Sequence, residues 1–118
     1  MKFFDLSEFD CSHTGANEMD EEFLAYVEEL RGACGFPFQI TSGYRHETHP
    51  EEARKDSPGF HSKGVACDIR VSNGVQRRTI VDQAIRFGFA GIGVANTFVH
   101  VDERSLTPGN WSDVLWTY

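Results

Sequence analysis

Two histidines and two aspartates stand where they could bind a metal ion and move protons. The stretch HSKGVACDIR contains His61 and Asp68, and TFVHVD contains His100 and Asp102. Two imidazoles and one carboxylate are ligands that zinc accepts, and three protein ligands leave a fourth position for water, as in catalytic zinc sites. One interpretation of these residues is therefore a zinc site made by His61, Asp68 and His100.

The alternation of apolar and polar residues predicts that these side chains share one face of a sheet. Successive side chains point to opposite faces of a strand, so the valines of TFVHVD face the core while His100 and Asp102 face away from it. In GVACDIRV the same alternation places Asp68 on the outer face. If the two strands are neighbours, the three side chains lie together, and His61 can fold over them from the loop before the first strand.

The spacing alone leaves a plainer alternative open. His61 and His100 would then be ordinary polar residues, and Asp68 would pair with Arg70, which lies two residues further on the same face. The two histidines and the aspartate are separated by a loop and a helix, so they form no strong local signature.

The elements that would position these residues are two helices and five short strands. Apolar stripes with i, i+3, i+4, i+7 spacing predict helices over residues 19–33 and 75–87. The side chains expected to face inward are Phe23, Tyr26, Val27 and Leu30 in the first helix and Ile80, Val81, Ala84 and Ile85 in the second. Strands are predicted within FQITS, GVACDIRV, GFAGIGVA, TFVHVDE and DVLWTY.

These elements predict an α+β fold. Only one segment reads as a strand–helix–strand unit, and the chain finishes with hairpin-like strands. We expect a small, largely antiparallel sheet with the two main helices packed on one face and the zinc site on the other. Residues 46–63 are polar and predict a long surface loop, in which part of HPEEARK can be helical.

Length and charge limit the classes of protein further. At 118 residues the chain is expected to form one domain, residues 1–118, and its net charge of −7 argues against nucleic acid as a partner. No apolar run approaches the roughly 20 residues that span a bilayer, so no membrane partner is expected. The N-terminal MKFFDLSEFD lacks the apolar stretch of a signal peptide. We expect a monomer that is synthesised in the cytoplasm without a signal peptide.

Several motifs, taken together and in order, resemble the zinc D-alanyl-D-alanine carboxypeptidases. The pattern H-x-x-G-x-x-x-D formed by His61, Gly64 and Asp68 is followed, after a helix, by GIGV and FVHVD. The resemblance extends upstream to EFDCSHTG and ITSGYR and downstream to the closing W-x-Y, so that it covers nearly the whole chain. These enzymes are peptidoglycan peptidases related to the Hedgehog signalling domain. The chain looks closest to the short, single-domain members of phages and prophages.

The resemblance implies a role for each residue that matches the motifs. His61, Asp68 and His100 would be the ligands of one Zn²⁺ ion. Arg45, after S-G-Y, would bind a substrate carboxylate or the oxyanion of the scissile peptide; the alternative for it is a surface salt bridge with Glu47 or Glu51. His49, in the polar loop, is a further candidate for substrate binding.

The general base is where the pattern departs from the family. Many relatives have an acid three residues before the last histidine ligand, where this chain has Thr97. We expect Asp102 to be the catalytic residue that takes the proton from the attacking water and passes it to the leaving amine. The alternative is that Asp102 orients a ligand imidazole.

The function implied is hydrolysis of a D-amino-acid-containing peptide bond of bacterial peptidoglycan by metal-activated water. The partner would be a peptidoglycan stem peptide, and the protein would act on the cell wall, in a phage lysis or virion role. Gly59 stands where many carboxypeptidase relatives have a serine, which argues against strict carboxypeptidase specificity. The alternatives are an L-alanyl-D-glutamate or cross-link endopeptidase and a non-catalytic zinc-containing binding module.

Overall fold

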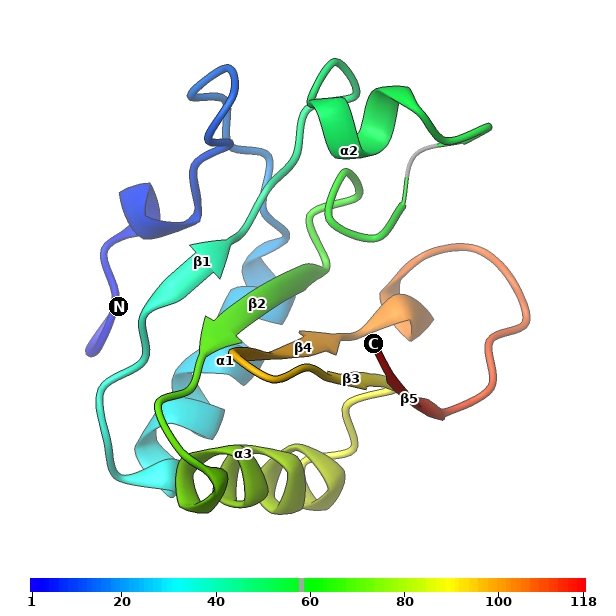
Figure 1. The fold of residues 1–118 in the computed structure, drawn as a ribbon. Coiled ribbons are helices and arrows are strands. Elements are labelled where there is room, and N and C mark those ends of the chain that lie inside the picture. The colour runs from blue at the N-terminus through cyan, green and yellow to red at the C-terminus, as the bar shows by residue number, and fades with distance from the viewer. Residues whose placement is uncertain (58) are drawn as a thin grey trace.

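The sheet has five strands, in the order β1-β2-β4-β3-β5 (Figure 1). The computed structural model describes residues 1–57 and 59–118. The strands are β1 (Ile40–Ser42), β2 (Ala66–Arg70), β3 (Gly91–Val94), β4 (Phe98–Asp102) and β5 (Val114–Thr117). The pairs β1–β2, β2–β4 and β3–β4 are antiparallel, and β3–β5 is parallel. The predicted α+β fold with a largely antiparallel sheet is confirmed.

Two main helices form where the sequence supplies the predicted apolar stripes, and the structure shows residues that cap them. The helices are α1 (Glu21–Cys34), α2 (Pro50–Ala53) and α3 (Gly74–Arg86), and short 3₁₀ turns cover Leu6–Phe9 and Arg104–Leu106. The Asp20 carboxylate accepts a hydrogen bond from the Phe23 N–H at the start of α1, and Asn73 caps α3 in the same way. Gly35, with φ of 76°, ends α1 in the left-handed conformation. The short α2 is the helical part of the polar loop.

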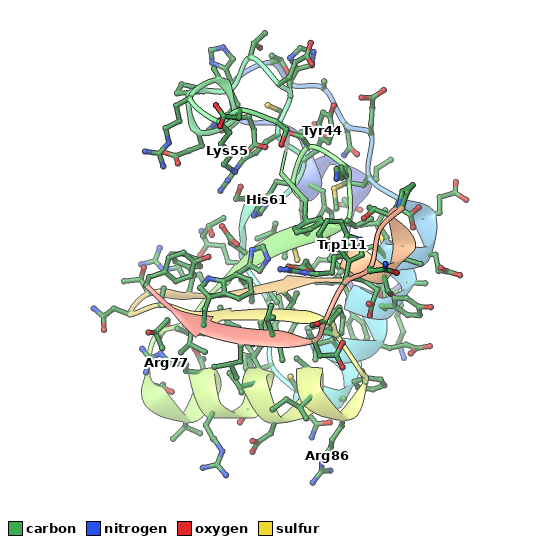
Figure 2. The ribbon with its side chains drawn as sticks, turned by 90° about the vertical axis from the view of Figure 1, so that its right-hand side faces the viewer. Tyr44, Lys55, His61, Arg77, Arg86 and Trp111 are labelled. Atoms are coloured by element: carbon green, nitrogen blue, oxygen red, sulfur yellow. The ribbon has the colours of Figure 1, made fainter. Side chains whose placement is uncertain are left out.

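The core lies between α1, α3 and one face of the sheet, with the polar loop on the other face (Figure 2). Its fully buried residues include Phe23, Val27 and Leu30 from α1, Ile80 and Ala84 from α3, and Cys67, Ile69, Val99 and Val101 from β2 and β4. The alternation predicted for these two strands is therefore confirmed.

The prediction that Ile85 faces the core is wrong. This side chain is 58% exposed, whereas Ala84 is fully buried. Ile80 and Ala84, four residues apart, define the buried line of α3, and the next residue is turned about 100° away from it. None of the described helices is long and apolar enough to cross a membrane.

Candidate metal centre

The antiparallel pairing of β2 with β4 brings the predicted ligands together. Asp68 stands opposite His100 in the register, with Ala66 opposite Asp102 on one side and Arg70 opposite Phe98 on the other. All of these residues alternate along their strands with core residues, so they lie on the face of the sheet away from the core. The two strands are therefore neighbours, which was the condition for these side chains to lie together.

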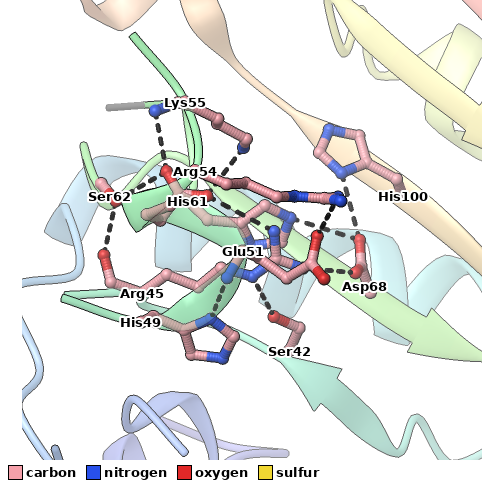
Figure 3. A network of polar contacts seen from close by, with 12 residues as sticks. Ser42, Arg45, His49, Glu51, Arg54, Lys55, His61, Ser62, Asp68 and His100 are labelled. Carbon is pink, nitrogen blue, oxygen red and sulfur yellow. Dashed lines mark hydrogen bonds and ion pairs between the residues drawn. The ribbon is translucent and has the colours of Figure 1, made fainter. Parts of the chain in front are cut away.

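His61, Asp68 and His100 form a group in which one ligand atom from each residue lies within 4.8 Å of the others. The Asp68 Oδ1 atom is 3.4 Å from His61 Nε2 and 3.1 Å from His100 Nδ1 (Figure 3). All three residues are buried. Gly64, with φ of 75°, turns the chain between His61 and β2, and any side chain there would overlap the Glu18 carbonyl.

The hydrogen bonds of the two imidazoles direct the right nitrogens towards a metal ion. His61 Nδ1 lies 2.9 Å from the Gly43 carbonyl oxygen, and His100 Nε2 lies 2.7 Å from Asp102 Oδ2. Because these oxygens can only accept, the two nitrogens donate. The other two nitrogens, His61 Nε2 and His100 Nδ1, face Asp68. When they carry no proton, their lone pairs are available to a metal ion, as in metal-bound histidines. The residues present therefore fit a zinc ion with two nitrogen ligands and one carboxylate.

The protonation states of the group also suit a cation. Burial raises the pKa of Asp68, but hydrogen bonds with His100 and His61 outweigh it and hold this pKa well below its usual range. Burial lowers the pKa of His61. Burial also opposes the charge on His100, but hydrogen bonds to Asp102 and Asp68 raise its pKa overall. A proton on His100 therefore competes with a metal ion for the same site.

Asp102 is fully buried, and both of its carboxylate oxygens are engaged. Arg104 donates to it from Nε and from a terminal nitrogen, over 2.9 and 2.8 Å, while His100 donates to Oδ2. Burial raises the pKa of Asp102, but the hydrogen bonds from Arg104 and His100 lower it to about 2. Of the two roles open from the sequence, these contacts match the one in which Asp102 orients a ligand imidazole.

Arg45 lies beside the group and is held in place from three sides. Its Nε donates to Ser42 Oγ over 3.0 Å, and its terminal nitrogens are 3.5 Å from Asp68 Oδ2 and 3.6 Å from Glu52 Oε2. The alternative of a surface salt bridge with Glu47 or Glu51 is not what the structure shows. Arg45 is half-buried at the wall of the cavity onto which the metal group opens.

That cavity has a volume of about 490 Å³. Besides the metal group and Arg45, its lining includes Phe60, Trp116 and Tyr118. His49 is not among the lining residues. Its Nδ1 accepts from the Glu51 N–H at the start of α2 and its Nε2 lies 3.3 Å from Ser12 Oγ, so the ring is turned towards the N-terminal segment.

Sequence reasoning missed four residues that shape the site. Arg104 and Glu52 hold Asp102 and Arg45, respectively. Gly91 and Gly93 leave space on β3, where a Cβ atom would overlap the Asp102 carboxylate and the Trp116 ring. The alternate glycines of GIGV, on a strand beside FVHVD, were the signal that could have revealed this space.

A buried group of two histidines and one aspartate that opens onto a cavity is typical of metal-dependent hydrolases. The chain belongs to the peptidase M15 family, because a family model described as Peptidase M15 matches residues 2–102. The family and the His61–Asp68–His100 group together support a metallopeptidase. No curated protein matches this chain.

Proposed function

We propose that the protein is a zinc-dependent peptidase that hydrolyses a D-amino-acid-containing peptide bond of bacterial peptidoglycan, in the manner of D-alanyl-D-alanine carboxypeptidases. The observation that carries this proposal is the ligand group of His61, Asp68 and His100, which opens onto a cavity that also contains Arg45. An L-alanyl-D-glutamate or cross-link endopeptidase would use the same chemistry on a different bond.

A zinc ion held at this site would supply a Lewis acid for the scissile carbonyl and would lower the pKa of a water molecule. His61, Asp68 and His100 would hold it. Arg45 is placed to bind a substrate carboxylate or the charge that develops on the carbonyl oxygen, because its guanidinium is fixed by Ser42 and faces the cavity.

We assign two acids different roles, one in orienting a ligand and one in proton transfer. Asp102 orients His100, since its oxygens are occupied and it has no exposed surface. Glu51 is exposed, lines the cavity from α2 and is paired with Arg54, so we assign it the role of proton acceptor and donor to the leaving amine. Among the described lining residues, it is the acid that stands outside the metal group.

The cavity wall is consistent with an anionic peptide substrate. Arg54, Lys55 and Arg104 line it together with Arg45, although the whole chain has a net charge of −7. The Arg104 guanidinium stacks 4.4 Å from the Phe60 ring centroid, which adds an aromatic surface next to the charge. Peptidoglycan stem peptides supply free carboxylates, so we propose such a peptide as the partner of a monomeric enzyme that acts at the cell wall, in a phage lysis or virion setting.

The experiment compares wild-type protein with His100→Ala in zinc content and in hydrolysis of purified peptidoglycan. We expect one zinc ion per wild-type chain, and loss of both zinc and hydrolysis in the variant. Absence of stoichiometric zinc, or hydrolysis that survives in His100→Ala, contradicts the proposal.

The second candidate is a non-catalytic zinc-containing binding module. Thr97 favours this second candidate. Many relatives have an acid at this position, and Thr97 does not line the cavity onto which His61, Asp68 and His100 open. Glu51→Gln separates the two: an enzyme should lose most of its turnover while retaining zinc, whereas a binding module should lose neither zinc nor affinity for wall peptides.

A further inference from the structure

A second cleft of about 610 Å³ lies next to the metal-bearing cavity. Its lining residues are Thr41, Arg70, Val71, Ser72, Thr97 and Phe98. Phe98 lines both spaces, so the two adjoin at this residue. A substrate lying in the metal-bearing cavity can therefore extend into the second cleft.

The strand register places Arg70 and Phe98, which line this cleft, two residues along their strands from the metal group. Asp68 pairs with His100, and the next pair on the same face is Arg70 with Phe98. Two residues along a strand correspond to roughly 7 Å, which is also the length of about two residues of an extended peptide. Arg70 is thus positioned to meet a substrate group one or two residues from the bond at the metal.

Arg70 differs from the other arginines of this face in having no acidic partner. Arg45 contacts Asp68 and Glu52, and Arg104 contacts Asp102. Within the described part of the chain, no carboxylate lies within ion-pair distance of Arg70, and no acid lines its cleft. Its side chain is exposed and accessible to a ligand.

The other groups in the cleft can complete a site for an anion. Ser72 and Thr97 provide hydroxyl groups that can donate to a carboxylate, whereas the Thr41 hydroxyl donates to the Asp68 carbonyl over 3.4 Å. Val71 and Phe98 give the cleft apolar walls. A guanidinium binds a carboxylate through two parallel hydrogen bonds, which gives orientation as well as affinity.

We propose that Arg70 forms a carboxylate-binding subsite that selects substrate peptides with a free acidic group one or two residues from the scissile bond. This inference rests on the proposed peptidase function and specifies its substrate class. The carboxylate belongs to the peptide itself, so a peptide in which that group is amidated is the matched neutral substrate.

The test compares two synthetic stem peptides that differ only in a free or amidated carboxylate at that distance, once mass spectrometry has identified the cleaved bond. We expect the zinc-loaded wild-type protein to prefer the free acid by roughly tenfold in kcat/KM, and Arg70→Gln to remove the preference mainly through KM. Arg86→Gln is the control, because it removes the same charge from the exposed end of α3, across the sheet from His61 (Figure 2).

The possible results separate this inference from the proposed function. Equal cleavage of the two peptides by the wild type, or a preference that persists in Arg70→Gln, overturns the subsite and leaves the peptidase intact. If neither peptide is cleaved, the proposed function fails. Calorimetric titration then tests the subsite by comparing the affinity of the protein for stem peptides whose glutamyl carboxylate is free or amidated. If the wild type does not bind the free acid more tightly, or if Arg70→Gln does not reduce this preference, the subsite is overturned.

Discussion

The two imidazoles that could hold a metal ion are each fixed by a second group that the chain supplies. The Gly43 carbonyl orients His61, and Asp102 orients His100. Arg104 in turn holds Asp102 through two hydrogen bonds. Because such outer partners set the direction and basicity of the ligand nitrogens, they affect metal affinity without touching the metal.

Asp102→Asn should lower zinc affinity by about 10- to 100-fold, since the amide weakens the hydrogen bond that orients His100. Competition with a chromophoric chelator measures this change. Asp113→Asn, at an exposed position before β5, is the control and should bind zinc as the wild type does. Unchanged zinc affinity together with lost turnover would instead identify Asp102 as the proton acceptor.

Zinc affinity should also fall as the pH is lowered. The pKa of His100 is raised by its hydrogen bonds to Asp102 and Asp68, so below that pKa a proton must leave before the metal binds. We expect a loss of about tenfold per pH unit below the pKa, with protons released on binding. Calorimetric titration at pH 8 and pH 6, in two buffers of different ionisation enthalpy, tests this; equal affinities without proton release would contradict it.

Among the elements, β3 supports the site because two of its residues are glycines, which carry no side chain. Gly91 stands opposite Asp102 in the register, and Gly93 stands opposite His100. The Asp102 carboxylate and the Trp116 ring lie across the space above them. The strand thus supports the site by leaving room for side chains from its two neighbours, β4 and β5.

Gly91→Ala should destabilise the protein by about 1–3 kcal/mol and weaken zinc binding, because the new methyl group overlaps the Asp102 carboxylate. Urea unfolding and zinc titration measure the two effects. Gly74→Ala is the control, since its methyl group would come no closer than 3.7 Å to another group. Wild-type stability and zinc affinity in Gly91→Ala would rule out this role for the strand.

The loop that carries α2 is tied to the site by the buried Glu52 carboxylate. It accepts hydrogen bonds from the Gly59 N–H over 2.8 Å, from Ser62 Oγ over 2.8 Å and from Lys55 Nζ over 2.7 Å. Burial raises the pKa of Glu52, but these hydrogen bonds lower it from 4.5 to about 2. The loop before His61 is thus anchored by an ionised acid.

A carboxyl group whose pKa is lowered by folding stabilises the protein above its unfolded pKa, and this stabilisation is lost as the pH falls towards the folded pKa. Glu52→Gln should therefore cost about 2 kcal/mol at pH 7, with a difference from wild type that shrinks between roughly pH 4.5 and pH 2. Urea unfolding across this range provides the measurement, with Glu51→Gln as the exposed control. A difference that is independent of pH would show that Glu52 is not held as a carboxylate.

Across the whole molecule, the pattern of apolar residues was enough to predict the order of the elements along the chain and the outward face of the two site strands, but not that these strands pair with each other. Both main helices begin and end within two residues of the prediction, and the alternation in β2 and β4 put Asp68, His100 and Asp102 on one face, as observed. Periodicity carries this information because it depends on burial alone.

Periodicity does not predict contacts between side chains that are distant in the sequence. Arg104 and Glu52 stood out in no pattern of the sequence, and His49 read as a candidate for substrate binding. The partners of all three are set by how loops fold over the sheet. The direction of Ile85 was mispredicted for a related reason, since an apolar residue beside the buried line of α3 fits the stripe equally well.

The proposed zinc-dependent hydrolysis is tested by mass spectrometry of peptidoglycan stem peptides after incubation with the zinc-loaded protein and, in parallel, with His100→Ala. We expect new products from cleavage of one D-amino-acid-containing bond with the wild-type protein and none with the variant. No products with zinc-loaded wild type, or the same products with His100→Ala, would contradict it.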